Sequence, residues 1–391
     1  MITRRLVNTL GLSQLVCWGI SYYLIGGFGE LMVADLGWSR ALVYGGFSAS
    51  LAVMGLTSQM TGRFIDRHGG RKVMATGSCL IGLGCAMLAL AHGVATYYAA
   101  WLVLGLAMRL TLYEAAFASL ARIGGPAARR LISQITLLGG LASTVFWPIG
   151  SFLAAALGWR GAVLVYAAIA LATTVPHLTI PDARYEASSA PKESRIEPKC
   201  SARRRVAAGF LYATSAALAN FMNSSMSSQM IGILAGLGLA GGVAVSVATL
   251  RGVGQSAARL AEFLFGGRLN PLDLNVAAAL ALPISFAAGL FSGSSVALAM
   301  IFALLYGAGN GLLTITRGTL PLILFDPREY GKIAGGLLAP SFLSAAAAPL
   351  ICAYLAERLG QEAVLHLSLA LGCAILVCAI ILRGAFRASG D

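Results

Sequence analysis

Four arginine residues lie inside long apolar stretches of this sequence, where a charge is costly. They are Arg109, Arg251, Arg259 and Arg317. A guanidinium binds a carboxylate through two parallel hydrogen bonds, so such a residue is suited to hold an organic anion. Arg251 has no acidic residue within four positions, which favours a role in binding an anionic solute. The alternative is a structural pair with an acid on another helix. Arg109 is predicted to bind the same solute from the other half of the chain.

One acidic residue, Glu114, follows Arg109 in the same apolar region. A carboxyl group in such a place can exchange a proton as a cavity opens to each side, and Glu114 is therefore predicted to couple transport to protons. The alternative is a permanent salt bridge to Arg109 or Arg317. Five residues along a helix correspond to about 140° of rotation, which disfavours the pair with Arg109 within one helix. Arg259 is expected to pair with Glu262, three residues further on.

Aromatic and amide side chains accompany these charges. Trp18 and Tyr22 lie four residues apart and share a helix face, so they either line a cavity or pack as an ordinary pair; Tyr113, beside Glu114, has the same two interpretations. Residues 220–229 contain seven polar side chains, among them Asn223. This stretch either breaks its helix into an outer gate or lines a polar vestibule. We assign Trp18, Tyr22, Tyr113 and Asn223 to solute binding.

The composition shows what kind of elements must position these residues. Of 391 residues, 58% are hydrophobic and 11% are charged, and the mean hydropathy is +0.80. Soluble domains carry about 25% charged residues, so the excess apolar surface is expected to face lipid. This excludes soluble enzymes, disordered chains and secreted disulfide scaffolds. The net charge of +13 fits basic loops facing an anionic lipid leaflet, and no nucleic-acid partner is expected.

The apolar stretches predict an all-α integral membrane protein with twelve transmembrane helices. Each helix needs about 20 apolar residues, and backbone groups within lipid must be satisfied inside the helix. The fourth helix is expected to run without a break through Arg109 and Glu114 to about Leu120. With the amino terminus inside, the inner segments hold 21 of the 28 Lys and Arg residues and the outer loops hold three. The positive-inside rule then places both termini in the cytoplasm.

The two halves of the chain match at a nearly constant offset. Leu36-Gly37 aligns with Leu237-Gly238, and Gly105 aligns with Gly307. Pro126 and Pro327 precede helices five and eleven, and Pro148 and Gly158 resemble Pro349 and Gly360. A parallel duplication places a binding site between the halves near the membrane midplane. We predict two pseudo-symmetric six-helix bundles, residues 1–180 and 206–391, joined by a cytoplasmic linker over residues 181–205.

The loop after the second helix carries a more specific pattern, G-x3-D-R-x-G-x-R-K, formed by residues 62–72. It strongly resembles the signature between helices two and three of the major facilitator superfamily. The resemblance implies alternating access and a cytoplasmic gate that breaks and reforms. The resemblance assigns that gate to Gly62, Asp66, Arg67, Gly69 and Arg71. We add Arg317, because its position lets it reach the inner surface or pair across the gate.

Gly37-Trp38-Ser39-Arg40, before the second helix, makes the sequence most similar to the bacterial monocarboxylate and oxalate–formate branch. That resemblance implies a monomeric secondary transporter of small organic anions in the inner (plasma) membrane. The alternative is a drug or toxic-solute efflux antiporter of the same fold, in which Glu114 binds a cation. An integral-membrane enzyme is disfavoured because the four His residues are dispersed. The seven Cys residues form no metal-ligand spacing, so neither a metal nor a cofactor is expected.

Overall fold

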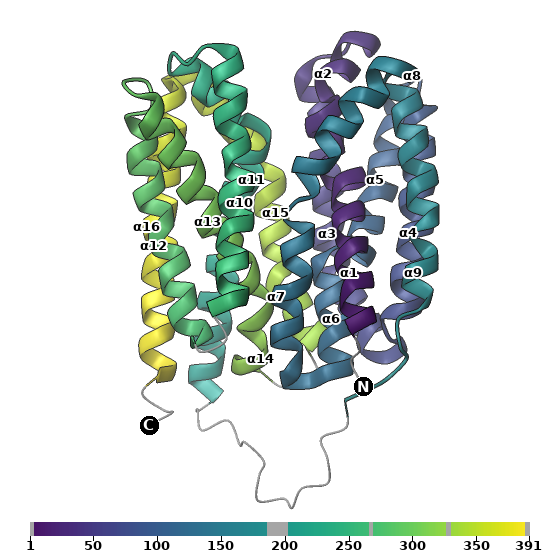
Figure 1. The fold of residues 1–391 in the computed structure, drawn as a ribbon, viewed down its shortest axis with the longest axis vertical. Coiled ribbons are helices and arrows are strands. Elements are labelled where there is room, and N and C mark those ends of the chain that lie inside the picture. The colour runs from purple at the N-terminus through teal and green to yellow at the C-terminus, as the bar shows by residue number, and fades with distance from the viewer. Residues whose placement is uncertain (1–3, 186–201, 266–268, 326–329, 388–391) are drawn as a thin grey trace, which may run out of the picture.

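The chain is helical throughout the part that the computed structural model describes, residues 4–185, 202–265, 269–325 and 330–387. The first half contains α1 (Arg4–Cys17), η1 (Trp18–Tyr22), α2 (Leu24–Leu36), α3 (Arg40–His68), α4 (Gly70–Ala89), α5 (Val94–Thr111), α6 (Tyr113–Gly124), η2 (Gly125–Ala127), α7 (Ala128–Gly139), α8 (Ala142–Ala172) and α9 (Thr174–Leu178). The second half contains α10 (Ala202–Gly236), α11 (Gly241–Phe265), α12 (Pro271–Leu290), α13 (Val296–Thr319), α14 (Pro321–Leu324), α15 (Tyr330–Leu359) and α16 (Gln361–Arg387). Figure 1 shows two upright bundles, one from each half.

Eight helical segments of the described chain are long and apolar enough to cross a membrane. One of them, Leu131–Leu178, contains two helices joined at Gly158, where φ is 70°. The first segment, which is divided into the shorter helices α1, η1 and α2, runs alongside these, as do α10 and α11. Together they make the twelve crossings predicted from the sequence. Most of the predicted linker, residues 186–201, lies outside the described residues, and the bundle boundaries stay a prediction.

The backbone repeats the sequence duplication at its turns. Gly37 and Gly238 both have positive φ, 67° and 101°, and each follows the first helical segment of its half. Gly158 and Gly360, with φ of 70° and 86°, join the last two membrane helices of each half. Glycine adopts this backbone region without the penalty that a Cβ imposes. The offset between the two halves therefore marks equivalent positions in three dimensions.

Helix packing repeats in the same way. A side chain at Gly105 of α5 would collide with the Ser50 carbonyl of α3, and one at Gly307 of α13 would collide with the Arg251 carbonyl of α11. The absence of a side chain lets each helix pair approach to backbone contact. The partners Ser50 and Arg251 lie 201 residues apart and the two glycines 202, so both pairs follow the repeat to within one residue. The twelve helices thus form two bundles with matching internal contacts.

Two helices depart from the regular spans that the sequence predicts. The first segment contains a π-helical turn, Trp18–Tyr22; such turns are frequent at functional sites. The fourth span is interrupted at Leu112, whose ψ of −170° ends α5, and α6 begins at Tyr113. The prediction of one continuous helix through Arg109 and Glu114 was wrong. The interruption has a local cause: the backbone of Leu112 is extended, so the residues on its two sides no longer follow one helical rotation.

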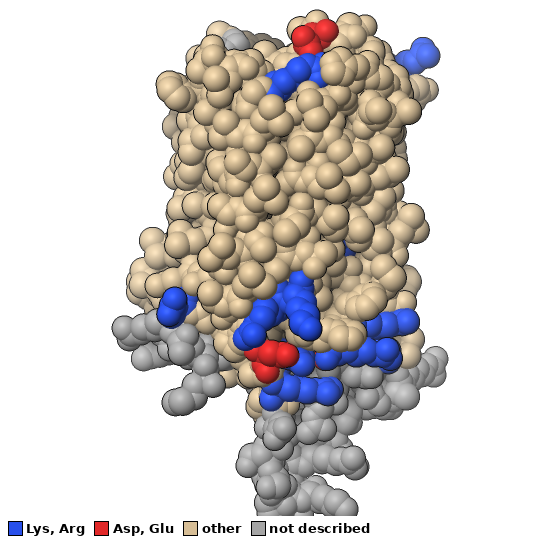
Figure 2. Space-filling view, turned by 90° about the vertical axis from the view of Figure 1, so that its right-hand side faces the viewer, with Lys and Arg blue, Asp and Glu red and all other residues tan. Residues whose placement is uncertain are grey.

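Both chain termini and the segments leading to the linker lie at one end of the molecule, which we call the basic end (Figure 1). Figure 2 shows Lys and Arg side chains gathered there, with a broad uncharged band above them on that face. Arg63, Arg67 and Lys72 are exposed residues of this end, near the α3–α4 turn. The asymmetry agrees with the distribution of charge along the sequence.

Several helix pairs join the two bundles, and α3–α15 and α7–α11 are two of them. In the α3–α15 contact, Ser58 donates its hydroxyl to the Gly335 carbonyl at 2.7 Å. In the α7–α11 contact, Arg259 donates to the Thr136 carbonyl at 2.6 Å. Both contacts lie in the half of the molecule nearer the basic end, and the two ribbons diverge toward the opposite end (Figure 1). The conformation is therefore closed toward the basic end.

Candidate functional site

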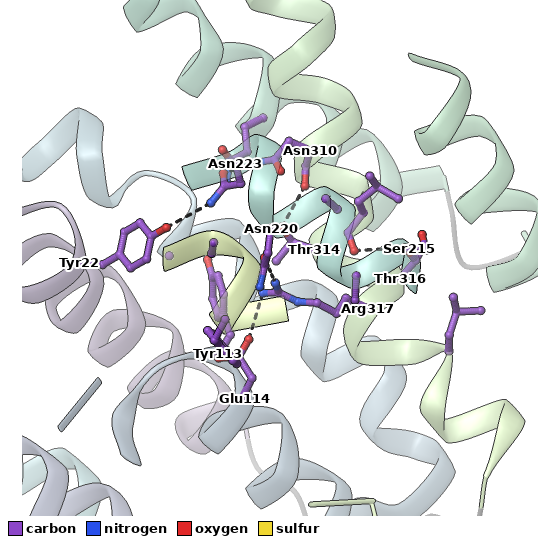
Figure 3. A pocket seen from close by; sticks show the side chains of 18 of the residues that line it. Tyr22, Tyr113, Glu114, Ser215, Asn220, Asn223, Asn310, Thr314, Thr316 and Arg317 are labelled. Atoms are coloured by element: carbon purple, nitrogen blue, oxygen red, sulfur yellow. Dashed lines mark hydrogen bonds and ion pairs between the residues drawn. The ribbon is translucent and has the colours of Figure 1, made fainter. Parts of the chain in front are cut away.

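A central cavity lies between the bundles, above their contacts at the basic end. It contains about 970 Å³ of space, open solvent at its mouth included. Aromatic and apolar side chains of the first bundle face polar side chains of the second (Figure 3). The first group includes Trp18, Tyr22, Tyr23, Leu51, Met54 and Tyr113, and the second includes Ser215, Asn220, Asn223, Gln255, Arg259, Asn310, Thr314, Thr316 and Arg317.

The aromatic wall is built on the π-helical turn. Its ring centroids lie 4.8 Å apart for Trp18 and Tyr22, and 4.9 Å apart for Trp18 and Tyr113. All three residues line the cavity, so the two interpretations of these aromatic residues, packing and lining, both describe the structure. Tyr22 lines the cavity but is otherwise buried, with 7% of its surface exposed. The wall is thus rigid and offers flat apolar surface to a solute.

Amide groups form a polar bridge on the opposite wall. Asn310 of α13 donates to Asn223 of α10 at 3.0 Å, and Asn223 donates to the Tyr22 hydroxyl across the cavity at 3.5 Å. Helix α10 runs unbroken through this polar stretch, from Ala202 to Gly236. Of the two alternatives for this stretch, the broken helix is therefore excluded, and the polar lining is the one the structure supports. Regular i to i−4 bonds satisfy the backbone, and polar side chains of its inward face line the cavity.

A salt bridge joins the two bundles at the floor of the cavity. Arg317 of α13 lies 3.1 Å from the Glu114 carboxylate of α6, and it donates to the Asn220 side chain at 2.6 Å (Figure 3). Both charged side chains are largely buried, with 15% and 5% of their surfaces exposed. Of the two partners considered for Glu114 from the sequence, the structure places Arg317 in contact with it. A solute or proton that reaches this pair acts on a contact between the bundles.

The interruption at Leu112 positions this carboxylate. Glu114 stands in the first turn of α6, where the unpaired backbone N–H groups and the helix dipole favour a negative charge. A helix continuing through residue 112 would turn Glu114 to a different direction. The break therefore aims the acid at the second bundle.

Arg251 lies behind the polar wall and is not among the cavity-lining residues. Its guanidinium donates to Asn223 at 2.6 Å and to the Ser227 hydroxyl at 3.0 Å, and it lies 5.2 Å from the Tyr306 ring centroid. Its partners are neutral, so the structural acid pair considered from the sequence is not what holds it. In this conformation Arg251 orients Asn223, which itself faces the cavity.

Arg109 does not line the central cavity either. It borders a smaller cavity nearer the basic end, which it shares with Glu114, Arg317 and the first turns of α15. Only 2% of its surface is exposed. The helix break at Leu112 again explains the placement, because it separates the direction of Arg109 from that of Tyr113, which does line the central cavity.

Sequence reasoning missed the role of Arg259. It lines the central cavity, and its guanidinium donates to Thr136 and Tyr113 of the first bundle, at 2.6 and 3.3 Å. These contacts tie Arg259 to the first bundle, and its expected pair with Glu262 stays a prediction. The available signal was Gln255, four residues earlier and hence on the same face of α11; Gln255 lines the cavity too. Arg259 and Arg317 are the two described guanidinium groups that border the central cavity.

The loop motif places one acid across the bundle contact. The Asp66 carboxylate accepts hydrogen bonds from the backbone N–H groups of Gly331 and Lys332, at 3.1 and 2.8 Å. These N–H groups belong to the first turn of α15, where a negative charge is favoured. One turn before Asp66, Gly62 packs so closely that an added Cβ would collide with the Gly331 carbonyl. Asp66 and Gly62 therefore hold the basic end closed in this conformation.

The remaining motif residues act within the first bundle. Gly69 has φ of 79° at the α3–α4 turn, which suits glycine. Arg71 donates to the Ile180 carbonyl at 2.6 Å, and Arg122 pairs with Asp182 at 2.9 Å. These bonds fix the segment that leads into the linker. The Arg67 side chain is exposed, and its assignment to the gate stays a prediction.

The family model described as Major Facilitator Superfamily matches residues 10–337. A search of curated proteins gave no match.

Three solved structures have similar folds. The human organic anion transporter TETRAN has a TM-score of 0.70 at 18% identity, with 96% of this chain and 99% of that chain covered. FucP in an outward conformation has a TM-score of 0.70 at 13% identity, with coverage of 96% and 98%. The proton:xylose symporter XylE bound to 6-bromo-6-deoxy-D-glucose has a TM-score of 0.71 at 16% identity, with 98% of this chain and 94% of that chain covered. These identities establish the fold alone. With the family model spanning most of the sequence, the chain belongs to the major facilitator superfamily, whose members move small solutes across membranes.

Proposed function

We propose that this protein is a secondary active transporter of a small organic anion, coupled to protons. The observation that carries the proposal is the charge of the central cavity. Two guanidinium groups, Arg259 and Arg317, border it with one carboxylate, Glu114. The guanidinium groups outnumber the carboxylate, and an excess of positive charge in the middle of a membrane protein favours an anionic solute.

Proton coupling follows from the contact between Glu114 and Arg317. While Glu114 is ionised, its carboxylate is paired with the Arg317 guanidinium, the group that a solute carboxylate would bind. A proton arriving on Glu114 removes that competition, and the solute carboxylate takes its place beside Arg317. The charge of the cavity then stays the same before and after the exchange. A proton and an anion would enter together, as in a symporter.

Alternating access would use the two bundle contacts. Opening the basic end requires Asp66 to leave the first turn of α15 and Arg259 to leave the Thr136 carbonyl. Release of Arg259 exposes a guanidinium beside the cavity. A bound carboxylate can compensate this charge, so solute binding and opening are energetically linked.

Orientation and location form part of the proposal. The excess of basic residues at the end that holds both termini supports a cytoplasmic basic end. The inner (plasma) membrane and a monomeric state stay our proposals, as does the monocarboxylate and oxalate–formate branch. TETRAN is described as an organic anion transporter, but at this identity the arginine residues, not the likeness, support an anionic solute.

A second candidate is an efflux antiporter for apolar or cationic compounds. The aromatic wall of Trp18, Tyr22 and Tyr113 favours it, since flat rings bind aromatic and cationic solutes. In that case Glu114 would bind the cation itself.

Flux in proteoliposomes separates the two candidates. Labelled lactate, oxalate and the cation tetraphenylphosphonium would each be offered with and without a proton gradient. We expect at least one carboxylate to be accumulated faster with an inward proton gradient, and tetraphenylphosphonium to be unaffected. Transport of the cation with no flux of either carboxylate would reject the anion proposal in favour of the antiporter.

A further inference from the structure

The two halves of the chain each contain a buried arginine at an equivalent helix contact. Arg109 of α5 donates to the Ser58 carbonyl of α3 at 3.1 Å, and Arg259 of α11 donates to the Gly311 carbonyl of α13 at 3.3 Å. Arg259 lies 201 residues after Ser58, and Gly311 lies 202 residues after Arg109, which are the offsets of the repeat. The same pair of positions thus meets in each bundle, with the arginine on opposite partners.

The two guanidinium groups differ in how well they are satisfied. Arg259 is 1% exposed, and each of its three nitrogens has an acceptor. With its amide oxygen turned toward the arginine, Gln255 accepts at 3.1 and 2.7 Å. Arg109 is equally buried, yet its Nε and Nη1 have no hydrogen-bond partner among the described residues. Buried charged donors without an acceptor are costly, so Arg109 needs a ligand that Arg259 does not.

A small cavity adjoins Arg109 where such a ligand would lie. It is lined by α5 and α6 of the first bundle and by α13 and α15 of the second. Its size allows about one water-sized molecule, which is too small for a carboxylate solute with a carbon chain. Gly331 and Gly335 help to leave this space, since neither carries a side chain.

The charges around this cavity favour an anion. Arg109 and Arg317 contribute two positive charges, and the one carboxylate, Glu114, is already held by Arg317 at 3.1 Å. Tyr330, Gly331 and Ala334 belong to the first turns of α15, where Asp66 already accepts from the N–H groups of Gly331 and Lys332, so the attraction for an anion rests on the two arginines. A neutral water would satisfy the donors of Arg109 but leave the excess positive charge.

We propose that this cavity binds a small monovalent inorganic anion of the chloride class, held by Nε and Nη1 of Arg109. The proposal does not depend on the solute carried in the central cavity. Because both bundles line the site, it is complete only while the basic end is closed. A ligand that binds one conformation stabilises that conformation, so chloride would favour the closed basic end.

Thermal unfolding of the purified full-length protein tests the site. The melting temperature would be measured in sodium chloride and in sodium gluconate at equal ionic strength. We expect chloride to raise it by about 2 °C or more, in a saturable manner, and Arg109→Gln to abolish the rise. Arg160→Gln is the matched control, because Arg160 also donates to buried backbone carbonyls but lies far from the cavity, beside Asp35. It should keep the chloride response.

Equal melting temperatures in the two salts for the native protein would overturn the proposal, as would a chloride response that persists in Arg109→Gln. If Arg109→Gln does not fold, Ala334→Leu fills the same cavity with apolar atoms and should abolish the response in its place. Crystals grown in sodium bromide give an independent readout. An anomalous peak within hydrogen-bond distance of Arg109 is expected, and its absence at full occupancy of other halide sites would contradict the assignment.

Discussion

Two of the contacts between the bundles occupy equivalent places in the repeat but use different chemistry. The α3–α15 contact is built from small residues, with Gly62 against Gly331 and Ser58 against Gly335. The α7–α11 contact is built on the buried guanidinium of Arg259. Ser58 and Arg259 are related by the repeat offset. A symmetric fold can therefore close through one contact of closely packed small residues and helix-end hydrogen bonds, and one contact built on a buried guanidinium that borders the cavity.

The steric contact should be the least tolerant of change. In Gly62→Leu the new side chain would collide with the backbone of α15. Because backbone atoms cannot move aside as a flexible side chain can, the collision would not be relieved. We expect the basic end to stay open and solute flux to fall by more than about 100-fold, the cost of about 3 kcal/mol in the closed state. Flux in proteoliposomes measures this, and the full-length protein should still insert and purify.

Gly384→Leu is the matched control for that change. Gly384 has no other atoms within 4 Å of an added Cβ, so flux should stay near the native value. Equal losses in both variants would show that the collision at α15 is not the cause.

The electrostatic contact should give the next largest effect. Arg259→Gln keeps a hydrogen-bonding group but removes the charge beside the cavity. We expect anion flux to fall by about 10- to 100-fold, because a charged hydrogen bond contributes about 1.5–3 kcal/mol. Arg259→Lys should recover part of the flux. Initial rates against solute concentration would measure both, and an unchanged rate in Arg259→Gln would remove this residue from the proposed site.

A substitution in the salt bridge at the cavity floor should separate proton coupling from the conformational change that moves the solute. Glu114→Gln imitates the protonated acid, so Arg317 is released permanently. We expect proton-driven accumulation to be lost while solute exchange at equal concentrations stays within about threefold, because no barrier to reorientation is added. Accumulation that still responds to a pH gradient in this variant would contradict the coupling role.

The smallest effect is expected at the helix terminus. Asp66→Asn keeps a hydrogen-bond acceptor at the first turn of α15 but removes the charge that complements the helix dipole. Such an interaction contributes about 0.3–1 kcal/mol, so the balance between open and closed states should shift by about two- to fivefold. Labelling of a cysteine introduced at Ala334, which is buried in the closed state, would report the shift, and unaltered labelling would show that charge is not what holds Asp66 there.

The sequence predicted the helices, their number and the repeat because these depend on hydropathy, charge and glycine spacing along the chain. It also brought Tyr22, Asn223 and Glu114 to attention as candidates, and the structure places them at one cavity. It did not predict the extended conformation at Leu112, since nothing in the local residues marks it. The directions of Arg109 and Arg251 depend on that break and on side chains of distant helices.

Arg259 is a second residue whose contacts could not be predicted from its neighbours in the sequence. Its nearest acid along the chain, Glu262, suggested a local pair, yet the carbonyl that holds it comes from Thr136 in the other bundle. A buried guanidinium takes the acceptors that the tertiary fold offers, and these are not ordered by sequence distance. The repeat offset to Ser58 becomes informative only once the equivalent contact is seen.

Distances across both ends of the molecule test the central account most directly. In a cysteine-free protein, one pair of spin labels would be placed at Arg63 and Ile323 near the basic end, and another at Leu31 and Val243 near the opposite end; all four residues are exposed. Lactate or oxalate would be added at low pH, whichever the flux assay shows to be carried. The account predicts that a population appears in which the basic-end distance lengthens while the opposite distance shortens. Distances that both stay fixed, or that lengthen together, would contradict alternating closure around the arginine-bearing cavity.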